Sequence, residues 1–202
     1  ARRELNDIDR ATEFYEAALE CFFSQGQSIP VALRESCMKA FADLGRMLSQ
    51  SGRWKELEQG YRRMIRRMDP NDPAAGELWH GLGTVYRRYL GHRDSAISSF
   101  EVASALDDKR LTRHRILVDL YEESGAERAE EAIKRRQRLL RDEPLVAAHY
   151  KALRKLYAIT KQYDKAWCAC RALAYLGQAD EDEMRYLNSR RQQFEWPTGT
   201  LD

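Results

Sequence analysis

The chain has 202 residues, of which 43% are hydrophobic and 33% charged, and its formal net charge is +2. The aromatic content of 10% is too high for a disordered chain, and 5 prolines and 11 glycines are too few for collagen or a flexible linker. No run of 18 apolar residues occurs, so we expect no membrane span. A polar chain with this many aromatic residues predicts a thin structure with a large surface relative to its core.

The N-terminal residues 1–27 predict a capping helix or half of a repeat. Ala11, Tyr15 and Ala18 recur there with the spacing of one helix face. The chain begins Ala1-Arg2-Arg3-Glu4, with neither an initiator Met nor an apolar signal region, so we expect a fragment or a processed piece of a longer protein.

Residues 31–70 predict the first of several helical hairpins. One amphipathic segment precedes Gly52 and a second one follows it, ending at Pro70. The apolar positions of the first segment are Phe41, Leu44, Gly45 and Leu48. Those of the second segment are Leu57, Tyr61 and Met64.

Residues 73–108 give the clearest hairpin pattern. The first helix is predicted to start at Asp72-Pro73, an N-cap followed by a first-turn proline. Its apolar face is formed at i, i+3, i+4 and i+7 by Trp79, Leu82, Gly83 and Tyr86, and the second helix carries Ala96, Phe100 and Ala103. Gly83 is a small residue where the two backbones must approach.

The same arrangement is predicted at 111–144 and 146–178, followed by a capping helix at 180–196. Asp180 with Glu183 forms a capping-box-like start for this last helix. Glycines mark the predicted ends of helices at Gly26, Gly52, Gly91, Gly125 and Gly177.

The repeat length leads to a family resemblance. Equivalent positions Leu48, Tyr86, Tyr121 and Tyr157 are 38, 35 and 36 residues apart. With Trp79, Leu82-Gly83 and Tyr86 on one helix and Ala96, Phe100 and Ala103 on the next, the chain resembles the tetratricopeptide repeat family. The Trp79 unit carries one extra residue in its turn, and the His114 unit carries two. The resemblance implies an all-α, right-handed superhelix of about four to five helical hairpins, formed as one domain over residues 1–202.

Signatures of catalysis are missing from the sequence. It has no glycine-rich phosphate loop, no His-Glu-x-x-His and no Gly-x-Ser-x-Gly. The four histidines are scattered over different repeats, and Cys168 and Cys170 are two apart on a predicted helix, so they point to nearly opposite sides. We therefore expect no enzyme activity, no metal and no cofactor.

A helical-hairpin solenoid places the first helix of each unit on its concave surface. The residues expected to face this groove are Arg46, His80, Thr84, Arg87, Arg115, Asp119, Lys151 and Lys155. They lean cationic, so we expect a protein-interaction scaffold that binds a partner peptide, preferably an acidic one. The few cysteines favour a cytoplasmic location, and the sequence gives no oligomeric state.

Two alternatives stay open. The chain could be an RNA-binding array like the pentatricopeptide proteins, although its low net charge argues against nucleic acid. It could also be an architectural spacer of a larger protein. A basic stripe on the second helices offers another binding surface: Arg62, Arg63, Arg66, Arg67, Lys134, Arg135, Arg136, Arg138 and Arg141.

Overall fold

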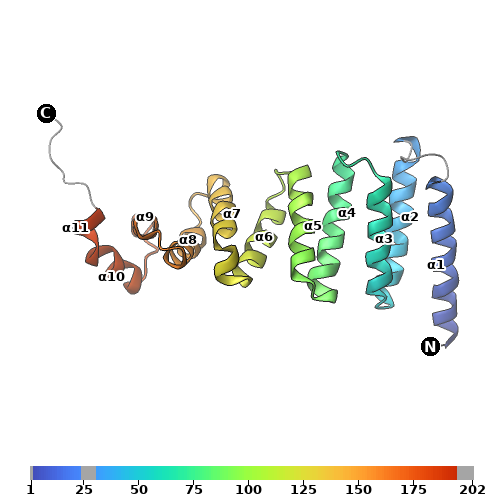
Figure 1. The fold of residues 1–202 in the computed structure, drawn as a ribbon, viewed down its shortest axis with the longest axis horizontal. Coiled ribbons are helices and arrows are strands. Elements are labelled where there is room, and N and C mark those ends of the chain that lie inside the picture. The colour runs from blue at the N-terminus through green and yellow to red at the C-terminus, as the bar shows by residue number, and fades with distance from the viewer. Residues whose placement is uncertain (1, 24–30, 195–202) are drawn as a thin grey trace. The chain divides into compact units, whose positions relative to one another are not determined.

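The computed structural model describes residues 2–23 and 31–194, and within these ranges every regular element is a helix (Figure 1). The predicted all-α fold of repeated helical hairpins is confirmed. The helices group into two compact units, unit 1 (residues 1–113) and unit 2 (residues 114–202). Residues 24–27, including the predicted stop at Gly26, and residues 195–196 of the predicted C-terminal cap lie outside the described residues.

Unit 1 is built from five α-helices, each packed on the next along the chain. Leu44, Leu48 and Met64 are almost fully buried in its core, and Phe41 and Leu57 are nearly so. These are the positions that the periodicity assigned to the apolar faces. The helices are α1 (Arg2–Phe23), α2 (Val31–Gln50), α3 (Trp54–Arg67), α4 (Pro73–Val85) and α5 (Arg93–Leu106).

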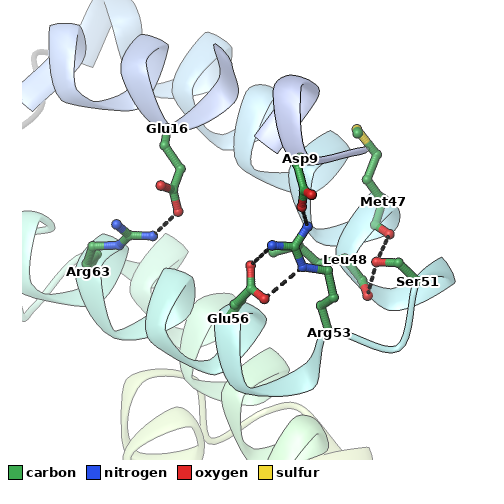
Figure 2. Close-up of polar contacts among 8 residues, drawn as sticks. All are labelled: Asp9, Glu16, Met47, Leu48, Ser51, Arg53, Glu56 and Arg63. Atoms are coloured by element: carbon green, nitrogen blue, oxygen red, sulfur yellow. Dashed lines mark hydrogen bonds and ion pairs between the residues drawn. The ribbon is translucent and has the colours of Figure 1, made fainter. Parts of the chain in front are cut away.

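Ion pairs connect α1 to α3 in addition to its packing on α2. Figure 2 shows Arg63 of α3 reaching Glu16, and Arg53, which precedes α3, reaching Asp9. The Arg53 guanidinium also lies 2.5 Å from Glu56 within its own turn. Two acidic side chains of α1 thus form ion pairs with one arginine just before α3 and one within it.

The α4–α5 hairpin begins and ends as the sequence predicts. The Asp72 carboxylate accepts a hydrogen bond of 2.9 Å from the Ala74 amide, and Pro73 is the first helical residue. After Val85 the chain makes one π-helical turn, η1 (Tyr86–Leu90), and then leaves the helix at Gly91, whose φ is 68°. A π-turn accommodates one inserted residue, which accounts for the extra residue in this repeat.

The described part of unit 2 begins within α6 and continues through five further α-helices. The two extra residues of this repeat are accommodated by a four-residue 3₁₀ turn before α7, η2 (Gly125–Arg128). Asp180 and Glu183 form the predicted capping box at the start of α10. Leu139, Cys170 and Leu173 are fully buried in its core. The helices are α6 (Leu111–Glu123), α7 (Ala129–Asp142), α8 (Ala147–Ile159), α9 (Tyr163–Tyr175), α10 (Glu181–Ser189) and the single turn α11 (Arg191–Phe194).

Candidate functional site

The predicted groove residues of unit 1 lie on α2, α4 and η1. Arg46 is exposed on α2, and its guanidinium lies 2.7 Å from the carboxylate of Asp43, one turn earlier. Thr84 is half-buried, and its hydroxyl donates to the His80 carbonyl at 2.9 Å. Arg87 is half-buried in the π-turn. These side chains are outside the core, but the polar groups of Arg46 and Thr84 are already engaged within their own helices.

His80 is more deeply placed than a groove residue. Its ring packs edge-on against Phe100, with 5.3 Å between the ring centroids. Burial, followed by the nearby Arg113 guanidinium, holds the pKa of His80 below its ordinary value of 6.5. Its Nδ1 atom is buried and has no hydrogen-bond partner among the described residues. The neutral imidazole therefore acts mainly as a packing group between α4 and α5.

A fully buried arginine lies beside His80. Arg113, in the first turn of α6, donates to the Ala103 carbonyl at 2.7 Å and to the Glu77 carboxylate at 2.8 Å. Burial opposes ionisation of Glu77, but Arg110 and Arg113 outweigh it and lower the pKa of this carboxyl. No sequence pattern indicated this cluster, because an arginine at the start of a helix normally stays in solvent.

The predicted groove residues of unit 2 are surface side chains with acidic neighbours. Arg115 on α6, 54% exposed, pairs with Glu143. The Lys151 ammonium on α8 lies 3.5 Å from Asp180 and 3.8 Å from Glu183. The remaining two predicted residues, Asp119 and Lys155, are exposed.

Most arginines of the predicted basic stripe have partners inside the molecule. Arg63 pairs with Glu16, and Arg138 lies 2.8 Å from Asp142. Arg136 makes two contacts, at 2.8 Å and 3.1 Å, with the Glu122 carboxylate. These pairings connect neighbouring elements or turns and reduce the charge available to an external anion.

An open pocket in unit 1 was not predicted from the sequence. It lies in unit 1 on the side of the second helices, between α3 and α5 and over α4, and has a volume of about 500 Å³. Its apolar wall is formed by Ile65, Trp79 and Leu82, together with the ring of Tyr86. Arg62 and Arg66 of α3 line one side, and Asp94, Ser95, Ser98 and Ser99 of α5 line the other.

A smaller pocket of about 220 Å³ occurs in unit 2 between α7 and α9, over α8. The residues that line it match those of the larger pocket by position: Leu140 for Ile65, Tyr150 for Trp79, Leu153 for Leu82, and Tyr157 for Tyr86. The tyrosine hydroxyl also has the same type of contact, because it accepts a 2.8 Å hydrogen bond from Arg62 in unit 1 and from Gln137 in unit 2.

Within the described ranges, no group of three or more His, Cys, Asp or Glu side chains is placed to hold a metal ion. Cys168 is exposed and Cys170 is buried, in keeping with their opposite sides of α9. Burial raises the pKa of the Cys37 and Cys170 thiols, which disfavours the nucleophilic thiolate. A search of the helices in the described part of the chain finds none that is both long and apolar enough to cross a membrane.

A family model and solved structures both point to a helical-repeat fold. The family model described as "Tetratricopeptide repeat" matches residues 40–74 and 78–113. No curated protein matches the chain.

Among solved structures, the MamA crystal structure is 15% identical, with a TM-score of 0.53 and coverage of 95% of each chain. YrrB, described as a TPR protein with an unusual peptide-binding site, is 20% identical, with a TM-score of 0.53 over 93% of this chain and 85% of its own. The repeats of a Podosopora anserina putative kinesin light chain are 16% identical, with a TM-score of 0.53 over 87% of this chain and 90% of theirs. Residues 40–74 and 78–113 thus match the tetratricopeptide repeat, and the fold of the described chain is similar to that of solved helical-repeat proteins.

Proposed function

We propose that this chain is a non-catalytic scaffold that binds a peptide segment of a partner protein on the surface of its first helices. The term first-helix surface here means the solvent-facing side of α2 and α4 in unit 1 and of α6 and α8 in unit 2. Helical repeats use such surfaces for extended ligands because stacked hairpins present a row of side chains at regular intervals.

One observation carries the proposal: in α8 the side chains buried in the core and the two lysines occupy different positions of the helix. His149, Leu153 and Tyr157 are buried, whereas Lys151 and Lys155, one turn apart, are not. Since the core does not need these two lysines, their side chains are available to a ligand. Lys151 already faces Asp180 and Glu183, so Lys155 is the cation that an acidic ligand reaches at the lower cost.

The similarity to YrrB supports the same class of function, because that protein is described as having a peptide-binding site. The partner that fits the first-helix surface best is an acidic peptide. Each exposed ion pair contributes only about 0.2–1 kcal/mol, so charge selects the partner while apolar contacts supply most of the affinity.

The test compares two lysine reversals that carry the same change of charge. Peptides are selected from a random displayed library on the whole chain, and their affinities are measured by fluorescence anisotropy. Lys155→Glu on α8 is expected to weaken binding of the selected peptides about 3- to 10-fold, since it replaces an attraction by a repulsion. Lys134→Glu, at an exposed position on α7, is the control.

Equal affinity for Lys155→Glu, Lys134→Glu and the parent would remove the first-helix surface of unit 2 as the binding site. Thermal unfolding of both variants guards against a loss of fold, and their melting temperatures are expected to stay within a few degrees of the parent, as is usual for surface substitutions.

A further inference from the structure

The open pocket of unit 1 exists because small residues stand where unit 2 has a larger one. Ser95 of α5 occupies the position of Lys165 in α9, since each directly precedes the equivalent buried alanine, Ala96 or Ala166. The Lys165 ammonium lies over the ring of Tyr157, 5.9 Å from its centroid, and covers that wall. With serine at this position, the volume is about 500 Å³ instead of about 220 Å³. The pocket is therefore encoded by side-chain size at one defined position of the repeat.

The walls of this pocket suit a large apolar side chain. Ile65 and Trp79 are half-buried and Leu82 is buried, so they present one apolar surface that stays partly open to solvent. Covering such a surface is favourable by about 25 cal/mol per Å² of apolar area. A volume of this size is within the range of pockets that take a small ligand or a protein side chain.

The mouth of the pocket is cationic and one of its cations is held in place. The Arg62 guanidinium donates to the Tyr86 hydroxyl at 2.8 Å and pairs with Glu58 at 2.6 Å, yet its side chain remains 54% exposed. Arg66, one turn further along α3, is exposed and forms no ion pair with any residue of the described ranges. Asp94 is the acidic residue of the lining, so the two guanidinium groups outnumber the carboxylates there.

We propose that this pocket binds an acidic peptide segment of a partner protein by enclosing one large apolar side chain of that segment. The apolar side chain lies against Ile65, Trp79 and Leu82, and the flanking carboxylates face Arg62 and Arg66. The hydroxyls of Ser95 and Ser98 are placed to hydrogen-bond the peptide backbone. An apolar wall with Asp94 at its edge disfavours a nucleic-acid phosphate, so a peptide is the better match. This site is distinct from the first-helix surface and does not depend on it.

The pocket is tested with variants that fill it or reverse its charge. Ser98 is exposed on α5, so Ser98→Phe fills the pocket without touching the core, and Ser98→Ala leaves it open. Arg66→Glu reverses the charge at the mouth. Its control is Arg141→Glu, because Arg141 is the exposed residue at the equivalent position of α7 and does not line the smaller pocket.

The probes are peptides from the displayed library, each remade with its apolar anchor replaced by Ser and with its acidic residues replaced by Lys. Site-specific contact is read from the indole N–H resonance of Trp79, which is assigned with a Trp79→Phe sample. We expect the acidic, apolar-anchored peptides to shift this resonance. Ser98→Phe should abolish their binding, and Arg66→Glu should weaken it about 3- to 10-fold. Ser98→Ala and Arg141→Glu should bind like the parent.

Three results would each overturn the proposal. The first is that no selected peptide shifts the Trp79 indole resonance. The second is that Ser98→Phe and Arg66→Glu bind as well as their controls while Lys155→Glu does not, which leaves the first-helix surface standing and removes the pocket. The third is that a single-stranded RNA oligonucleotide, and no peptide, binds in a manner that depends on Arg66.

Discussion

Gly83 lies where the α4 backbone comes closest to a core ring. A Cβ atom at this position would meet three ring carbons of Phe100 at 3.0 Å, and Phe100 is itself almost fully buried. The ring has little room to move, so Gly83→Ala is expected to destabilise the protein by about 1–3 kcal/mol through overpacking. Chemical denaturation of the variant measures this change as a lower denaturant midpoint.

Gly45 provides the matched control, because it occupies the equivalent position of the preceding repeat. A Cβ there would lie 3.5 Å from the Leu57 side chain, an ordinary contact. Gly45→Ala is therefore expected to be neutral or to stabilise α2 by up to about 1 kcal/mol through helix propensity. If both alanine variants shift the midpoint equally, the close approach at Gly83 is not what selects glycine.

His80 predicts a dependence of stability on pH. Its folded-state pKa is lowered by burial and by Arg113, so below pH 6.5 the unfolded chain binds more protons at this residue than the folded chain does. The contribution of His80 is fully present above pH 6.5 and is lost as the pH falls through the lowered pKa. The pKa of the Glu77 carboxyl is also lowered, from its ordinary value of 4.5, so this group affects stability at a lower pH than His80 does.

The measurement is the thermal midpoint between pH 7.5 and pH 5.5, which we expect to fall. In His80→Gln the fall should be smaller, whereas His92→Gln, which removes an exposed histidine, should retain it. A parent midpoint that does not change over this range would mean that protonated His80 is accommodated in the fold.

Helix starts and ends could be predicted from the sequence where a residue type has a strong local conformational preference. The Asp72-Pro73 start and the Asp180–Glu183 capping box follow from short-range hydrogen bonding, and the structure shows both. Gly52, Gly91, Gly125 and Gly177 all have φ values between 66° and 70°. The equivalent turn between α8 and α9 instead has Lys161 at a φ of 59°, and the sequence could not indicate this because lysine is rarely left-handed.

At the scale of elements, the cap of α4 can be tested directly. The Asp72 carboxylate accepts a hydrogen bond of 2.9 Å from the Ala74 amide, so Asp72→Ala removes the side-chain cap of this helix start. The expected cost is about 0.5–2 kcal/mol. Asp72→Asn keeps an acceptor oxygen at the same place and is expected to retain most of the stability. Denaturant midpoints compare the two, and an equal loss in both would assign the effect to the charge of Asp72 and not to its cap.

The open pocket could not be derived from the sequence because it depends on the register between two elements. The extra residue in the π-turn η1 shifts α5 by one residue relative to Tyr86, compared with α9 relative to Tyr157. Only after this shift does Ser95 align with Lys165. The repeat pattern identifies the equivalent positions of the two hairpins. The backbone of the π-turn then determines which side chain of α5 lines the pocket.

For the whole molecule, the repeat period was sufficient to predict the helical class, because a pattern of 35 to 38 residues allows one supersecondary unit per period. The division into two compact units was not predicted, because no break in this repeat pattern marks residue 113. The sequence did not indicate which of the expected groove cations form internal ion pairs. In the structure, Asp43, Glu143 and Asp180 pair with such cations.

The distribution of charge over the whole chain predicts weak binding to nucleic acid. The net charge is only +2, and arginines of the second helices are paired internally, as in the contacts of Arg63 with Glu16 and Arg136 with Glu122. Few cations therefore remain to replace the counterions of a phosphate backbone. We expect a 20-nucleotide single-stranded RNA to bind with a Kd on the order of 10 µM or weaker at about 0.15 M salt.

The measurement is fluorescence anisotropy with two RNAs of different sequence across a salt series. Both RNAs are expected to give the same weak affinity, with a shallow dependence on salt, because contacts to the backbone alone carry no sequence information. A repeat array that reads one base per unit would behave differently, with submicromolar affinity for one sequence and a clear preference over the other. That result would replace the peptide scaffold by an RNA-binding array, and it would locate the working surface on the arginines that the internal ion pairs leave exposed.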